Sequence, residues 1–143
     1  MADCIVDSNL LVYLVDDTEK EKHSKALNWL ESNSEGLKQA GVLLQNLREF
    51  SAVLHKKKAR VEQGKINLWI SIFSRRFEVL DEKPEDTIKA NELTEKFKTD
   101  FWDAFIAASM ERLGIMAIYT ENTKDFDKIK TGIKAVNPFE INH

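Results

Sequence analysis

The chain has 143 residues, of which 43% are apolar and 31% are charged, with a formal net charge of -3. This size and composition predict one globular domain, residues 1–143, with a substantial core. The single cysteine, Cys4, excludes a disulfide within the chain and a cysteine-based zinc site. No global positive charge indicates nucleic-acid binding, although a local basic stripe is compatible with an acidic site.

The sequence contains no recognisable targeting or membrane signal. The opening stretch "MADCIVDSN" lacks the cationic segment and the long apolar run of a signal peptide. No window approaches the roughly 18 uncharged apolar residues that span a bilayer. We therefore expect a cytoplasmic protein with no membrane partner.

Short apolar runs alternate with helical patterns along the chain. Strands are expected at the start of "CIVDSN" (4–9) and at 41–45, 77–80, 115–120 and 133–139. Helices are expected at 10–15, 19–32, 46–58 and 60–75, from Pro84 onward, and at 102–113 before the cap glycine Gly114. This alternation predicts an α/β fold with a mainly parallel sheet covered on both faces.

Two acids occupy unusual places in the expected helices. Glu49 borders the apolar face formed by Phe50, Val53 and Leu54, and Asp103 lies among bulky apolar neighbours in "TDFWDAF" (99–105). An acid in such surroundings loses hydration unless it is paired, hydrogen-bonded or bound to a metal. Asp100, three residues before Asp103, is interpreted as the N-cap of the helix.

Polar residues also follow the expected strands, and ligands bind at the carboxyl ends of parallel strands. Asp7 follows the first strand, Glu49 the second and Asp125 the fourth, and Asp103 begins the helix that precedes the fourth. Clustered carboxylates repel one another unless a cation neutralises them, and oxygen ligands suit Mg²⁺. Such a site favours phosphodiester hydrolysis. Taken singly, each acid is equally typical of a helix cap, a solvated face or a loop, but four acids at one edge favour a site.

Four stretches resemble a known family in order and spacing: "IVDSNLLVYLVD" (5–16), "LLQNLREFSAVLHKK" (43–57), "FWDAFIAASMERLGIMAIYTENTKDF" (101–126) and "IKAVNPF" (133–139). They resemble the PIN-domain ribonucleases, and among them the VapC-type toxins of prokaryotic toxin–antitoxin pairs. The resemblance implies a three-layer α/β/α sandwich and a Mg²⁺- or Mn²⁺-dependent endoribonuclease acting on RNA. It also implies an antitoxin partner and a homodimer.

The resemblance assigns Asp7, Glu49 and Asp103 to the metal site. For the fourth position it favours Asp125, with Asn122 as a polar helper and Glu121 as an open alternative. Asn9 and Thr120 are expected to support the acids. Because the fourth acid is ambiguous, a second hypothesis is a PIN-like module that binds RNA or a partner without cutting.

The segment "HKKKAR" (55–60) is a candidate contact for RNA phosphates, through the basic side chains of Lys56, Lys57, Lys58 and Arg60. Solvated cations that complement a helix dipole explain this segment equally well. The three histidines show no metal-ligand spacing.

Overall fold

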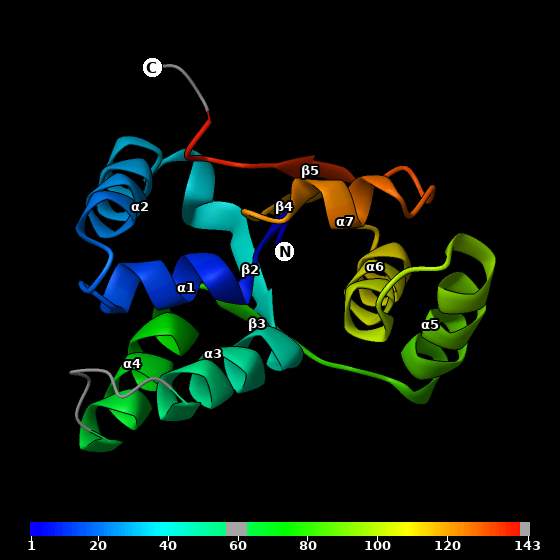
Figure 1. Ribbon diagram of the computed structural model, residues 1–143, viewed down its shortest axis with the longest axis horizontal. Helices are drawn as coiled ribbons and strands as arrows, with labels where there is room; N and C mark the ends of the chain where they lie inside the picture. Colours follow the sequence, from blue (N-terminus) through cyan, green and yellow to red (C-terminus); the bar gives the residue numbers. More distant parts are fainter. Residues whose placement is uncertain (57–62, 141–143) are drawn as a thin grey trace.

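A parallel β-sheet forms the centre of the molecule (Figure 1). The computed structural model describes residues 1–56 and 63–140, and within them the sheet has five strands in the order β3-β2-β1-β4-β5. The strands are β1 (Cys4–Val6), β2 (Ala40–Leu43), β3 (Glu78–Leu80), β4 (Ala117–Tyr119) and β5 (Lys134–Val136). Ile5 of the central strand is in register with Gly41 on one side and with Ile118 on the other. All four strand pairs are parallel, so their carboxyl ends meet at one edge.

Helices cover both faces of this sheet (Figure 1). One face is covered by α1 (Ser8–Val15), α2 (Lys20–Ser32), α3 (Leu44–Lys56) and α4 (Gln63–Arg76), and the other by α5 (Pro84–Phe97), α6 (Phe101–Leu113) and α7 (Thr123–Asp127). Successive residues of β1 separate the two cores: Cys4 and Val6 pack with α1 to α4, whereas Ile5 packs with α5 and α6. The predicted three-layer α/β/α sandwich is therefore confirmed.

The first helices begin earlier than the apolar pattern indicated. Helix α1 begins at Ser8 because Asp7 is its N-cap, and α3 begins at Leu44 rather than at residue 46. At the start of α3 the Asn46 side chain accepts a hydrogen bond from the Leu43 N–H at 2.8 Å. Polar caps of this kind satisfy the free N–H groups of a first turn, so they decide where a helix starts. A short 3-10 helix at Gly36–Gln39 was not predicted.

Helices α5 and α6 pack closely together, and an ion pair joins them. Asp86 is 1% exposed and accepts hydrogen bonds from Arg112 at 2.7 and 3.0 Å. Helix α6 ends at Gly114, whose φ of 72° is the left-handed conformation typical of a glycine C-cap. Among the described residues, no helix is long and apolar enough to cross a membrane.

Candidate active site

Asp7 lies at the carboxyl end of the central strand and is 4% exposed. Its Oδ1 accepts hydrogen bonds from the Ser8 N–H at 2.8 Å and from the Asn46 side-chain amide at 3.3 Å. Its Oδ2 accepts from the Thr120 hydroxyl at 2.7 Å and from the Asn9 amide at 3.4 Å. Burial raises the pKa of Asp7, and the hydrogen bonds from Thr120 and Ser8 oppose that rise. The carboxylate is therefore held in one orientation by donors from three segments of the chain.

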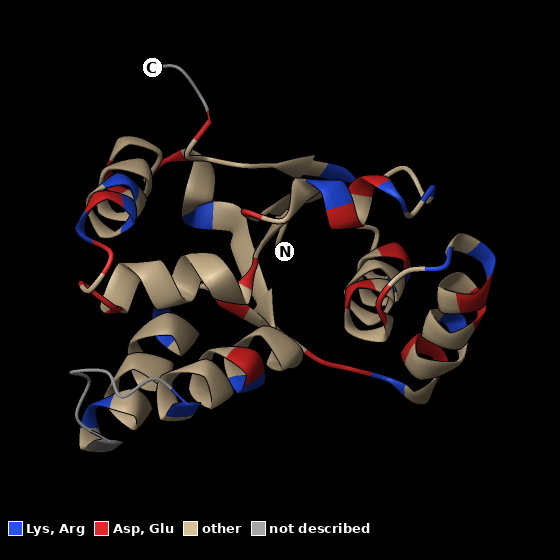
Figure 2. Ribbon diagram, viewed as in Figure 1, with Lys and Arg blue, Asp and Glu red and all other residues tan. Residues whose placement is uncertain are grey.

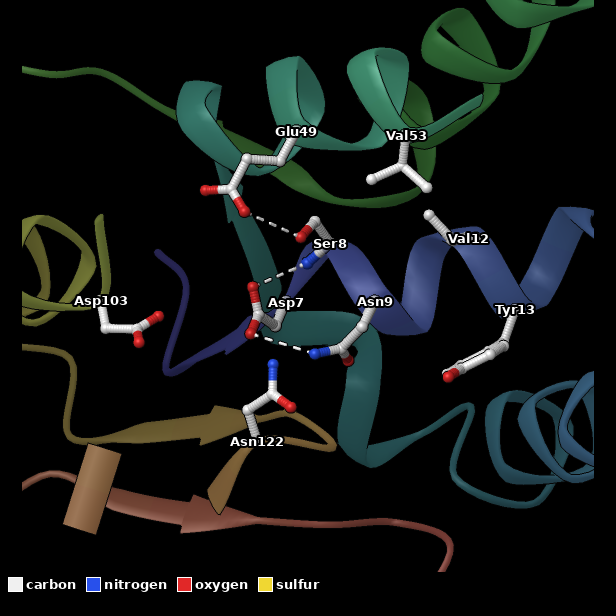
Figure 3. Close-up of a pocket in the computed structure, with 9 residues that line it drawn as sticks. All are labelled: Asp7, Ser8, Asn9, Val12, Tyr13, Glu49, Val53, Asp103 and Asn122. Atoms are coloured by element: carbon white, nitrogen blue, oxygen red, sulfur yellow. Dashed lines mark hydrogen bonds between the residues drawn. The ribbon is translucent and has the colours of Figure 1, made fainter. Parts of the chain in front are cut away.

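Glu49 projects from α3 toward Asp7, and Ser8 connects the two acids (Figure 3). The Ser8 hydroxyl donates to Glu49 Oε2 at 3.2 Å, and the Gln45 amide donates to Oε1 at 3.3 Å. Burial raises the pKa of Glu49, and the negative charge of Asp7 raises it further. The place of Glu49 beside the apolar face of its helix thus brings it to the sheet edge.

Asp103 lies in the first turn of α6, three residues after the N-cap residue Asp100. The Asp100 carboxylate accepts hydrogen bonds from the backbone N–H groups of Trp102 at 3.0 Å and Asp103 at 3.3 Å. Asp100 is therefore the cap that the sequence predicted, and its carboxylate is engaged by the helix end.

The Asp103 side chain is left to face the other acids. Its pKa is raised to about 7, first by burial and then by the negative charges of Asp100, Asp125, Asp7 and Glu49. The cluster therefore retains protons that isolated carboxyl groups release at much lower pH.

A pocket of about 210 Å³ collects these side chains (Figure 3). The acids lie at one end of the pocket, and Val12, Val53 and Tyr13 lie at the other. The lining consists of Asp7, Ser8, Asn9, Val12, Tyr13, Glu49, Val53, Asp103 and Asn122. Residues from α1, α3, α6 and the loop after β4 thus converge at the carboxyl edge of the sheet, where ligands bind in open parallel sheets.

The three candidates for the fourth position lie in different surroundings. Asn122 lines the pocket, whereas Asp125 lies in α7 and acts on Asp103 through its charge. Glu121 forms an ion pair with Lys22 at 2.8 Å and accepts a hydrogen bond from the Tyr13 hydroxyl at 2.9 Å. The Glu121 carboxylate is therefore engaged with α1 and α2 rather than with the acids.

The supporting residues form a hydrogen-bonded network around Asp7. Besides its bond to Asp7, Thr120 accepts from the Asn9 amide and from the Asn122 N–H, each at 3.1 Å. The side-chain oxygen of Asn9, Oδ1, accepts from the Glu121 N–H at 3.2 Å. The strand-end network thereby fixes the loop after β4 against the start of α1.

Two members of this network, Ser8 and Asn46, were not among the predicted site residues. Asn46 is fully buried, and its amide joins the start of α3 to Asp7. The signal for Asn46 was its place directly after an apolar strand and one helical turn before Glu49. A serine next to an N-cap residue carries no comparable signal, because serine is common at helix starts.

The donor chemistry of the pocket fits a hard divalent cation. Among the described residues, no Lys or Arg forms an ion pair with Asp7, Glu49 or Asp103. Figure 2 shows acidic positions on several elements around the centre of the molecule, and acidic and basic positions interspersed on the outer helices α2 and α5. Oxygen donors without a basic partner suit Mg²⁺ or Mn²⁺.

The acids are not arranged so that all of them could contact one metal ion directly. Within residues 1–56 and 63–140, no three Asp, Glu, His or Cys side chains converge closely enough to hold a bare ion. Mg²⁺ commonly keeps several waters and uses one or two carboxylates, so a partly hydrated ion is the form that matches this arrangement.

The predicted basic contact falls mostly outside the described structure. Lys56 is exposed at the end of α3, whereas Lys57, Lys58 and Arg60 lie outside the described residues.

Comparison with known proteins identifies the fold and a family. The profile of the PIN domain matches residues 4–132. Among curated protein sequences, none matches this chain significantly.

Solved structures align over nearly the whole chain at low sequence identity. A toxin–antitoxin complex from Klebsiella pneumoniae is 22% identical, with a TM-score of 0.67 and coverage of 96% of this chain and 99% of that one. VapC20 of Mycobacterium tuberculosis, a sarcin–ricin loop cleaving toxin, is 19% identical, with a TM-score of 0.71 and coverage of 87% and 92%. DNA-bound VapBC from Salmonella typhimurium is 19% identical, with a TM-score of 0.71 and coverage of 96% and 99%. At these identities the similarity establishes a shared fold.

Proposed function

Because this chain belongs to the PIN-domain family, we propose that it is a divalent-cation-dependent endoribonuclease and the toxin of a toxin–antitoxin pair. The observation that carries the proposal is the convergence of Asp7, Glu49 and Asp103 in one pocket without a basic partner among the described residues. A fold without a ligand for these groups gains nothing from burying them together, because burial and mutual repulsion both disfavour the charged forms.

In the proposed mechanism the three acids and the Asn122 or Asp125 position would hold a partly hydrated Mg²⁺ or Mn²⁺, so that some of these side chains contact its waters and not the ion itself. When bound, such a cation lowers the pKa of a water molecule and neutralises phosphate charge. The residues of the chain supply position and charge. Thr120 and the Ser8 N–H fix the Asp7 carboxylate, and the Ser8 hydroxyl orients Glu49. Without a cation the acids would repel a phosphodiester, so RNA binding at the acidic end should require a divalent cation.

The assignment of the acids is tested by RNA cleavage. Wild-type protein with Mg²⁺ or Mn²⁺ should cut a long RNA, and EDTA should stop the reaction. Asp103→Asn removes a negative charge but keeps the size of the side chain, so it should abolish cleavage while circular dichroism shows a native fold. Undiminished cleavage by Asp103→Asn would overturn the assignment.

The fourth position is tested by three substitutions made separately. Asp125→Asn should weaken Mn²⁺ binding if the α7 acid contributes, and Asn122→Ala should weaken it if the pocket amide does. Glu121→Gln should leave Mn²⁺ affinity unchanged, because its carboxylate is engaged by Lys22 and Tyr13.

The partners of the proposed toxin are an antitoxin and a second copy of the chain. Two of the similar structures are toxin–antitoxin assemblies, which supports a protein that is held inactive by a partner. A small reading frame next to the gene should encode that partner, and its coexpression should suppress cleavage. Light scattering of the purified chain should give the mass of a dimer.

A binding module that does not cut RNA is the alternative function. The observation in its favour is that, in the described residues, no three acidic side chains lie close enough together to hold a bare ion. Calorimetric titration with Mn²⁺ separates the two proposals, because heat of binding that requires Asp7 supports the nuclease. The absence of Mn²⁺ binding, even with RNA present, supports the module.

A further inference from the structure

The end of the pocket opposite the acids has no role in holding a cation. Val12, Val53 and the ring of Tyr13 line it, and Asn9 lies between them and Asp7 (Figure 3). Hard cations bind oxygen ligands; neither valine carries one, and the Tyr13 hydroxyl is engaged with Glu121 and Lys22. This end of the pocket therefore requires a different explanation.

Tyr13 is held firmly in this apolar end. Its hydroxyl donates to Glu121 at 2.9 Å and accepts from the Lys22 ammonium at 3.2 Å. Its ring contacts Phe139 edge-to-face, with centroids 5.5 Å apart. Lys22 is fixed in turn by its ion pair with Glu121 at 2.8 Å. A ring held at three points has already lost its rotamer freedom, so a ligand that packs against it meets a preorganised surface.

The two ends of the pocket match the two chemically different parts of a nucleotide. The acidic end would bind a phosphate with a cation present, and a planar base with apolar faces suits the valines and the tyrosine. The Asn9 side chain lies between these ends, where a sugar or a base edge offers hydrogen-bonding groups, whereas Asn122 lies beside Asp7 at the acidic end (Figure 3).

We propose that Tyr13, Val12 and Val53 form a subsite for the nucleobase of the nucleotide whose phosphate is bound at the acids. The subsite rests on the proposed ribonuclease function. It assigns Tyr13 as a substrate-binding residue, with Lys22 and Glu121 as the residues that position it. Base contact through a ring face tolerates different bases, so the subsite favours single-stranded RNA over a particular sequence.

The test compares ligands that differ only by the base. Calorimetry at a fixed Mn²⁺ concentration measures the affinities of uridine and adenosine 5′-monophosphates and of ribose 5-phosphate. Stacking on an aromatic residue should make the nucleotides at least about fivefold tighter than ribose 5-phosphate. Equal affinities in the wild-type protein would overturn the subsite.

Variants locate the effect. Tyr13→Leu should reduce the ratio of nucleotide affinity to ribose 5-phosphate affinity and leave the affinity for ribose 5-phosphate itself unchanged. Tyr13→Phe keeps the ring and should preserve most of this ratio. Val53→Thr places a hydroxyl on the apolar wall at nearly constant size and should also reduce the ratio, which provides a second variant if Tyr13→Leu does not fold. Trp102→Ala is the matched control, because this aromatic residue is 49% exposed and does not line the pocket. An unchanged ratio in Tyr13→Leu would overturn the role of Tyr13.

The same measurements separate failure of the subsite from failure of the function. RNA cleavage together with equal affinities for nucleotide and ribose 5-phosphate removes the subsite and leaves the nuclease. Loss of both RNA cleavage and Mn²⁺-dependent binding of ribose 5-phosphate removes the nuclease and the subsite together.

Discussion

Asp7 and Asp86 are both buried aspartates, at 4% and 1% exposure, yet their surroundings act in opposite directions. Burial raises the pKa of Asp7, and only neutral donors oppose that rise. Burial would also raise the pKa of Asp86, but the Arg112 guanidinium and the Lys83 N–H more than offset it, so the pKa of Asp86 is lowered. A buried acid that is neutralised inside the protein stabilises the fold, whereas one that is not neutralised is a candidate ligand for a cation from solution.

The largest effect is expected from exchanging each aspartate for its amide. Asp7→Asn should reduce RNA cleavage by more than about 100-fold, which exceeds the loss usual for residues that only orient a metal ligand. Its free energy of unfolding should fall less than that of Asp86→Asn, because the substitution loses an acceptor for the surrounding donors but also removes a buried charge that has no cationic partner. Asp86→Asn should do the reverse, with cleavage retained in protein that is less stable. Cleavage assays and urea unfolding of both variants measure the contrast, and a stability loss in Asp7→Asn larger than in Asp86→Asn would contradict it.

The next effect concerns the partner of Asp86. Arg112→Leu leaves a buried carboxylate without its cation and should lower the free energy of unfolding by about 3 kcal/mol. The double variant Asp86→Leu and Arg112→Leu removes both charges and should recover part of that loss. Urea unfolding of the wild type, the single variant and the double variant measures the difference. A double variant less stable than Arg112→Leu alone would show that the unpaired Asp86 carboxylate does not cause the stability loss of Arg112→Leu.

The two regions should also respond differently to pH in metal-free protein. Because the pKa of Asp103 is raised from 3.8 to about 7, its contribution to stability is present below about pH 4 and is lost as the pH rises through about 7. The pKa of Asp86 is lowered, so its contribution is present at neutral pH and is lost only in acid. Urea unfolding in EDTA between pH 4 and 8 should therefore show a decline that Asp103→Asn reduces and Arg112→Leu does not. An equal decline in the free energy of unfolding of the wild type and Asp103→Asn would contradict the raised pKa of Asp103.

Added cation should reverse that decline. At pH 8, Mg²⁺ at 100 times its dissociation constant should raise the free energy of unfolding by about 2.7 kcal/mol, since it binds only the folded chain. Asp7→Asn should show little of this gain. Stabilisation of Asp7→Asn equal to that of the wild type would place the cation elsewhere.

The smallest effect is expected at an exposed ion pair. Arg48 contacts Glu82 at 2.8 Å, and its side chain is 60% exposed. Arg48→Gln should therefore change the free energy of unfolding by less than about 1 kcal/mol. A loss as large as that of Arg112→Leu would mean that burial is not what separates the two ion pairs.

The convergence of Asp7, Glu49 and Asp103 in one pocket was predictable from sequence, because each of these acids stands out from its local pattern. Glu49 borders an apolar face, Asp103 stands among aromatic residues, and Asp7 ends a buried strand. The alternation of apolar runs also predicted the parallel sheet, since fully buried strands are short and continuous. These signals are local, so a single chain reveals them without a structure.

The remaining details depend on contacts between distant segments. The hydrogen bond from Asn46 to Asp7 joins residues 39 apart, and the bond from Tyr13 to Glu121 joins residues 108 apart. No periodicity encodes such pairs. The choice between Asn122 and Asp125 depends on how the five-residue helix α7 is turned, and a helix of little more than one turn has no apolar pattern to indicate its orientation.

The bond between Thr120 and Asp7 has a consequence for protein synthesis. These residues are 113 positions apart, and β1 takes its place in the sheet between β2 and β4. On the ribosome, Asp7 emerges long before Thr120 is made, so no nascent chain shorter than this span holds a complete set of donors around the acid. A protein proposed to cut RNA would thus acquire its pocket only after the ribosome that makes it has translated nearly all of the sheet.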